Sequence, residues 1–208
     1  MTFDDTKEFT YKYLALGDSY TIGESVDESE RFPVQLVSKL RKDNIDIADP
    51  MIIAKTGWTT DELAVAIEER KFKSAYDFVT LLIGVNNQYR GRSLEEYRIQ
   101  FKQLLEKAIL FAKGEPKKVL VISIPDWGVT PFAKERDTEK IASEIDEFNK
   151  INFEESKNAG ANYCNITGIS RKARTDTTLI ASDGLHPSGK MYGEWVGKFY
   201  DDVKNILK

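Results

Sequence analysis

Three residues in this sequence could together perform nucleophilic acyl transfer: Ser19, Asp183 and His186. His186 is the only histidine in the chain, and imidazole is the side chain that most readily takes up and returns a proton near neutral pH. Asp183 lies three residues before it, so its carboxylate can accept the Nδ1 hydrogen and leave Nε2 free to act on a serine hydroxyl. The spacing therefore predicts a Ser-His-Asp triad. The same segment also suits a plain turn at Asp183-Gly184, followed by a helix that Ser188 caps.

Acyl transfer also needs donors for the negative charge that develops on the carbonyl oxygen, and the loss of one donor typically costs about 10²–10³ in rate. The candidates are the Asn86 amide and the backbone N–H groups of Gly57 and Ser19. Asn86-Asn87 and Gly57 are also good turn residues, which is the simpler interpretation of both. We interpret Asp18, beside the nucleophile, as orienting the turn through backbone hydrogen bonds and not as the catalytic acid.

Aromatic side chains lie on or near the same loops: Tyr20, Trp58, Tyr89, Trp127 and Phe132. They could bind substrate by lining a small acyl pocket or by stacking on a sugar ring, and ordinary core packing is the alternative. Arg90 and Arg92 follow the third loop and either contact an anionic leaving group or, as we expect, lie in solvent.

The elements that must position these residues alternate between strands and helices. Apolar runs predict strands at 11–16, 51–54, 78–83, 119–124 and 162–166. Helical spacing and capping signals predict helices over 32–40, 59–71, 93–113, about 141–159 and 188–207. Residues 1–10 are expected to be a polar lead-in and 171–182 a loop. This alternation predicts a parallel sheet with helices on both faces, and the carboxyl ends of such strands gather ligands and chemistry.

Two of the predicted helices open with a capping box, in which the side chains and backbone N–H groups of two residues bind each other. Thr59 with Glu62 forms one, and Ser93 with Glu96 forms the other.

Composition limits the classes of protein to which the chain can belong. Its 208 residues, 41% hydrophobic and 31% charged, fit one globular domain over 1–208. The net charge of −4 argues against a nucleic-acid partner. Cys164 is the only cysteine, which excludes an intramolecular disulfide and a Cys/His zinc site, and we expect no metal or other cofactor. The amino terminus lacks a signal-peptide pattern, and no apolar run approaches the ~20 residues of a membrane span, so we expect a cytoplasmic protein.

Four sequence blocks, in order, resemble those of the SGNH hydrolase superfamily, also called the GDSL esterases and lipases. Residues 17–19 resemble the first block, 56–57 the second, 84–87 the third and 183–188 the last. Each block alone is weak, but four in the right order, each at a predicted loop, form a specific signal that spans the chain from about residue 11 to its end.

Two positions depart from the family pattern. Tyr20 stands where the family usually has leucine, and Asn87 stands where it usually has aspartate. Tyr20 could narrow the pocket, and Asn87 could alter how the third loop is held.

The resemblance implies a three-layer α/β/α sandwich with a flavodoxin-like, five-stranded parallel sheet in the order 2-1-3-4-5. It implies ester hydrolysis through an acyl-enzyme on Ser19, with Asp183 and His186 completing the triad and Ser19, Gly57 and Asn86 forming the oxyanion hole. We expect a small ester as substrate, with a short acyl or acetyl group, for example on a carbohydrate.

Two alternatives remain open at this point. A lysophospholipase or acyl-thioesterase would use the same family machinery. A flavodoxin-like module that binds FMN or phosphate would instead use the hydroxyls of Ser19, Thr21 and Ser25 after the first strand.

Overall fold

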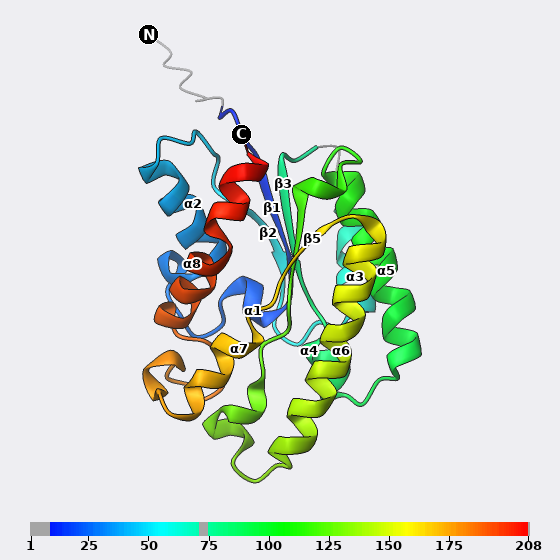
Figure 1. Ribbon diagram of the computed structural model, residues 1–208, viewed down its shortest axis with the longest axis vertical. Coiled ribbons are helices and arrows are strands. Elements are labelled where there is room, and N and C mark those ends of the chain that lie inside the picture. Colours follow the sequence, from blue (N-terminus) through cyan, green and yellow to red (C-terminus); the bar gives the residue numbers. More distant parts are fainter. Residues whose placement is uncertain (1–8, 71–74, 208) are drawn as a thin grey trace.

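A central sheet of five parallel strands organises the protein (Figure 1). The structure, a computed structural model, describes residues 9–70 and 75–207. The strands are β1 (Tyr13–Gly17), β2 (Met51–Ala54), β3 (Phe78–Leu82), β4 (Val119–Ile122) and β5 (Asn162–Cys164). They lie in the order β2-β1-β3-β4-β5, so the predicted fold class and strand order are confirmed.

The sheet register aligns the carboxyl ends of its first three strands. Gly17 at the end of β1 pairs with Ala54 on one side and with Leu82 on the other. Every residue of β1 and β3 is buried, as expected for central strands whose two faces are both covered by helices. The loops that follow these strands therefore emerge side by side.

Four strands are shorter than predicted, and β2 alone has the predicted bounds. Tyr11, expected to begin the first strand, makes only an isolated bridge to Ile47. The chain leaves β5 after Cys164 because the N–H groups of Ile166 and Thr167 donate to a side chain, the hydroxyl of Ser123, instead of to a neighbouring strand.

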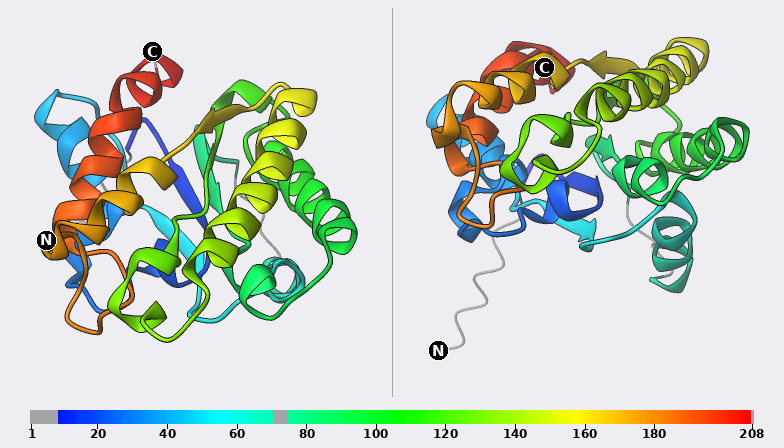
Figure 2. Two further views of the ribbon diagram at one scale, coloured as in Figure 1. Left: turned by 60° about the horizontal axis from the view of Figure 1, so that its bottom comes forward. Right: turned by 90° about the horizontal axis from the view of Figure 1, so that it is seen from below.

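Long helices cover both faces of the sheet, as Figures 1 and 2 show. On one face lie α2 (Phe32–Lys42) and α8 (Gly189–Ile206), and on the other α3 (Thr60–Glu69), α5 (Leu94–Phe111) and α6 (Thr138–Ala159). Phe32 of α2 packs between Trp195 and Phe199 of α8, with ring centroids 6.3 Å apart in both pairs. Aromatic packing thus fixes α8, and with it the loop that precedes it.

Only one of the two predicted capping boxes is complete. The Thr59 hydroxyl and the Glu62 carboxylate each bind the other's backbone N–H at the start of α3. Ser93 accepts the N–H of Glu96 at the start of α5, but the Glu96 carboxylate instead pairs with Arg92 at 2.7 Å.

Three short helices stand where no helix was predicted. They are α1 (Ser19–Ile22), α4 (Val85–Tyr89) and α7 (Thr167–Ser170). The predicted loop 171–182 contains 3-10 turns at Arg171–Arg174 and Thr177–Leu179. Further 3-10 turns occupy Glu28–Glu30, Pro116–Lys118, Trp127–Val129 and Pro131–Ala133. The predictions for residues 1–8 and for Lys71 lie outside the described residues.

Over residues 9–70 and 75–207, no helix combines the length and the apolarity needed to cross a bilayer.

Candidate active site

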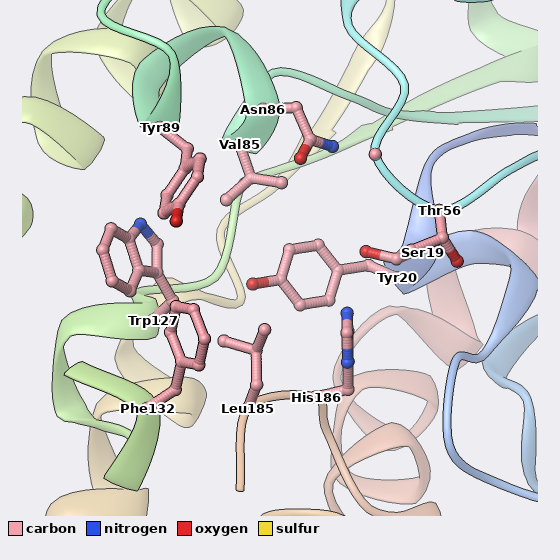
Figure 3. Close-up of a pocket in the computed structure, with 11 residues that line it drawn as sticks. Ser19, Tyr20, Thr56, Val85, Asn86, Tyr89, Trp127, Phe132, Leu185 and His186 are labelled. Carbon is pink, nitrogen blue, oxygen red and sulfur yellow. The ribbon is translucent and has the colours of Figure 1, made fainter. Parts of the chain in front are cut away.

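The loops at the carboxyl edge of the sheet surround a cavity of about 210 Å³ (Figure 3). Ser19 reaches it from the start of α1, Gly57 from the loop after β2, and Asn86 from α4 after β3. His186 reaches it from the loop before α8. The structure thus brings to one cavity four of the residues predicted from separate sequence blocks.

The turn that presents Ser19 is built from its two preceding residues. The Asp18 carboxylate caps α1 by accepting the N–H of Tyr20 at 3.0 Å, as the sequence predicted. A Cβ on Gly17 would lie 2.4 Å from the Leu82 carbonyl, so only glycine fits at this point. Ser19 itself is 5% exposed and opens onto the cavity.

The second carboxylate oxygen of Asp18 has no hydrogen-bond partner among the described residues and is buried. Burial raises the pKa of Asp18 to about 7, against the opposing effect of the Tyr20 N–H. Asp18 is therefore a carboxyl group whose surroundings favour its neutral form.

Asp183 and His186 form a tight pair. The imidazole Nδ1 lies 2.6 Å from Oδ2 of Asp183, and Oδ1 accepts the N–H groups of Leu185 and His186 at 2.9 and 3.0 Å. Gly184 supplies the left-handed backbone (φ 74°) that closes this turn. Burial alone would raise the pKa of Asp183, but hydrogen bonds from His186, from these backbone N–H groups and from Ser25 hold it well below its usual range.

The His186 ring is oriented toward the serine. Figure 3 shows its second ring nitrogen directed toward Ser19. In the described part of the chain the imidazole is bound to Asp183, while the Ser19 hydroxyl makes no hydrogen bond to it. Catalytic hydrogen bonds of this kind often tighten only when substrate is bound.

Ser25 is a site residue that the sequence argument assigned to a different role. Its hydroxyl donates to Oδ2 of Asp183 at 2.8 Å, from a backbone in the left-handed region (φ 65°) that serine rarely adopts. The neighbouring Glu24 carboxylate accepts the hydroxyl of Thr56, beside Gly57. A serine with positive φ is not visible in a sequence, so no local signal could have found this contact.

These contacts also count against the phosphate-binding alternative. Of the three hydroxyls it requires, that of Ser25 is bound to Asp183, and Thr21 is fully buried with its hydroxyl against Gly17. The three hydroxyls do not converge on a common anion site.

Two of the three predicted oxyanion donors, Gly57 and Asn86, lie on segments that hold each other. The Asn86 Nδ2 donates to the Trp58 carbonyl at 2.9 Å, which leaves its second amide hydrogen for another acceptor. Gly57 adopts a left-handed backbone (φ 86°), and its carbonyl accepts a hydrogen bond from Arg90 at 2.7 Å. Arg90 also pairs with Glu62 at 3.3 Å, so it clamps the Gly57 loop and does not simply lie in solvent.

Two neighbouring side chains complete the support of these loops. The Asn87 amide accepts the N–H of Thr60 at 3.1 Å and donates to its hydroxyl at 2.7 Å, so the departure from the family pattern ties α4 to the start of α3. Arg92 pairs with Glu96 and, at 3.6 Å, with Asp61.

Four of the five aromatic residues proposed from the sequence line the cavity, namely Tyr20, Tyr89, Trp127 and Phe132. Trp58 does not; it lines a separate groove with Asp61 and Val65 on α3, and its contribution to the site is its backbone carbonyl. Thr56, Val85 and Leu185 complete the cavity wall. The described residues contain no group of three or more His, Cys, Asp or Glu side chains that could hold a metal ion.

The fold is a three-layer α/β/α sandwich with a cavity at the carboxyl edge of its parallel sheet. Residues 15–193 match the model of the GDSL-like Lipase/Acylhydrolase family, and the chain belongs to that family. It is therefore a carboxylic ester hydrolase. A search of curated proteins by sequence found no significant match.

Solved structures with the same fold are distant in sequence. TesA superposes with a TM-score of 0.74 at 14% identity, over 94% of this chain and 99% of that one. LAE5, an alpha/beta hydrolase enzyme from the metagenome of Lake Arreo in Spain, superposes with a TM-score of 0.72 at 17% identity, over 96% of this chain and 97% of that one. Axe2, an acetylxylan esterase from Geobacillus stearothermophilus, superposes with a TM-score of 0.72 at 17% identity, over 94% of each chain. At these identities the likeness is one of fold.

Proposed function

We propose that the protein hydrolyses short-chain carboxylic esters through an acyl-enzyme formed on Ser19. The observation that carries the proposal is the placement of His186. Its Nδ1 is held by Asp183 at 2.6 Å, while its other ring nitrogen is directed toward Ser19 across a cavity that Gly57 and Asn86 also line (Figure 3).

In the first half of the reaction, Nε2 of His186 takes the Ser19 proton as Oγ attacks the ester carbonyl. The negative charge on the carbonyl oxygen is bound by the N–H groups of Ser19 and Gly57 and by the free amide hydrogen of Asn86. The imidazolium, steadied by the Asp183 carboxylate, then gives its proton to the leaving alcohol, and the ester bond breaks.

In the second half, His186 takes a proton from a water molecule, which attacks the acyl-enzyme. The same donors bind the second tetrahedral oxyanion. The imidazolium returns its proton to Ser19 as the acid product leaves, so the site is restored without any added cofactor.

An acetyl or other short acyl ester, for example on a carbohydrate, is the substrate class that we propose. A cavity of about 210 Å³ is small for a long acyl chain, and the exposed rings of Tyr89 and Phe132 at its wall suit a sugar face. The name of Axe2 as an acetylxylan esterase supports the same choice.

The decisive experiment compares the wild type with Ser19→Ala on p-nitrophenyl acetate. We expect a burst of nitrophenol from the wild type and a loss of about 10⁴ or more in kcat for the variant. Ser38→Ala, at an exposed serine of α2, is the matched control and should hydrolyse normally. Equal rates for Ser19→Ala and the wild type would contradict the mechanism. Acetylated xylan, an acyl thioester and a lysophospholipid, assayed side by side, would identify the leaving group.

A further inference from the structure

Tyr20 occupies the interior of the cavity beside the nucleophile. Its side chain is only 3% exposed, yet Figure 3 shows the ring extending from Ser19 along the cavity, with its hydroxyl directed toward Trp127, Val85 and Leu185. We propose that Tyr20 determines acyl specificity by restricting the substrate to a short acyl chain. This inference rests on the proposed function and deepens it.

The ring separates two spaces. Tyr20, Trp127 and Leu185 line the main cavity of about 210 Å³, and the same three residues line a void of about 10 Å³ behind it. The void continues toward Ile180 and Met191. A smaller side chain at position 20 would join the two spaces and lengthen the path that leads away from Ser19.

The ring is fixed in this position. It packs edge-on against His186 at 5.8 Å between centroids and against Trp195 of α8 at 6.4 Å. Its own backbone N–H is held by Asp18 at 3.0 Å. Contacts on both sides resist a rotation of the ring out of the cavity, so a long chain cannot simply displace it.

The hydroxyl adds a second barrier to long alkyl chains. In the described part of the chain the Tyr20 hydroxyl has no protein partner, whereas the neighbouring Trp127 Nε1 donates to Gln88 at 2.8 Å. Burial raises the pKa of the Tyr20 phenol, so the group keeps its proton and remains a donor. A short acyl group leaves water on this hydroxyl, but an alkyl chain that covers it would strand a buried donor, which is costly.

The test is an acyl-length series of p-nitrophenyl esters, from acetyl to octanoyl, on the wild type, Tyr20→Phe and Tyr20→Leu. We expect the wild-type kcat/KM to be highest for acetyl to butyryl. Tyr20→Phe keeps the ring and should raise the octanoyl-to-acetyl ratio several-fold. Tyr20→Leu removes the ring between the two spaces and should raise the octanoyl-to-acetyl ratio by about tenfold or more, as expected when a pocket gains room for extra methylenes.

Tyr163→Phe, which removes the hydroxyl of a tyrosine on β5 far along the sheet, is the control and should leave the series unchanged. Two results would overturn the inference: a wild type that prefers the octanoyl ester, or an octanoyl-to-acetyl ratio that is unchanged in both Tyr20→Phe and Tyr20→Leu. Neither result bears on the mechanism, which Ser19→Ala tests separately. If Tyr20→Leu does not fold, the wild-type series and Tyr20→Phe decide the matter.

Discussion

Asp18 and Asp183 are two carboxyl groups of the candidate site, and their surroundings shift their pKa values in opposite directions. Asp18 is fully buried, accepts the Tyr20 N–H on one oxygen and has no partner for the other among the described residues. Asp183 is 28% exposed, and its two oxygens accept hydrogen bonds from the Ser25 hydroxyl, the His186 ring and two backbone N–H groups. The pKa of Asp18 is raised to about 7, while that of Asp183 is held well below its usual range.

The difference shows how one residue type serves two purposes. A carboxylate that must balance an imidazolium needs donors on both oxygens to stay charged, and Asp183 has them. A carboxyl that only caps a short helix needs one acceptor oxygen, and Asp18 meets that need in its neutral form. If Asp183 is the catalytic acid, as we propose, then the number of donors around a carboxylate is a better guide to that role than adjacency to the serine.

Removing the charge at Asp183 should have the largest effect. In Asp183→Asn the imidazole loses the acceptor that fixes its tautomer, so we expect kcat to fall by about 10⁴ with little change in KM. Steady-state kinetics on p-nitrophenyl acetate measure this, and Asp176→Asn, at the aspartate that caps the 3-10 turn Thr177–Leu179, is the control. A loss smaller than tenfold would mean that the pair does not act as a catalytic unit.

Removing one donor from Asp183 should have an intermediate effect. Ser25→Ala leaves three of the hydrogen bonds to Asp183, so we expect kcat to fall by roughly tenfold or less with KM unchanged. Ser25→Gly removes the same hydroxyl but suits the positive φ of 65°, so it should be more stable than Ser25→Ala and equally impaired in kcat. Full activity in both variants would remove Ser25 from the support of Asp183.

Asp18→Asn should change activity least and alter the pH dependence of stability. Because the folded-state pKa of Asp18 is raised from 3.8 to about 7, its neutral form stabilises the wild type fully below about pH 4, and this stability is lost as the pH rises toward 7. A shift of this size corresponds to roughly 4 kcal/mol. Asparagine keeps the acceptor and cannot ionise, so the variant should gain in relative stability between pH 4 and 8. Urea unfolding across that range measures the gain. Parallel plots of unfolding free energy against pH for the two proteins would show that Asp18 does not titrate in this way.

Much of the fold was visible in the sequence because the signals are local. Apolar runs marked all five strands, and the Thr59 cap marked the start of α3. The close pairing of Asp183 and His186 was predictable for the same reason, since three residues and a glycine turn suffice to form it. Their catalytic role remains a prediction that the variants above test.

The supporting contacts were hidden because they join distant segments. Arg90 is exposed, as expected, but it also binds the Gly57 carbonyl 33 positions away. Ser25 reaches Asp183 over a separation of 158 positions, from a backbone conformation that its residue type does not suggest. Trp58 was expected to face substrate, yet its side chain lies in another groove. Spacing and composition carry no information on such contacts.

The adjacent residues Glu24 and Ser25 connect two functional parts of the site. Glu24 holds Thr56 beside the Gly57 loop, and Ser25 holds Asp183. The segment between Ser19 and this dipeptide is therefore a spacer whose length is fixed. A change of one residue in that spacer would displace the anchors of the Gly57 loop and of Asp183 together. For protein engineering, this short and largely buried segment is therefore an unsuitable place for an insertion or a graft.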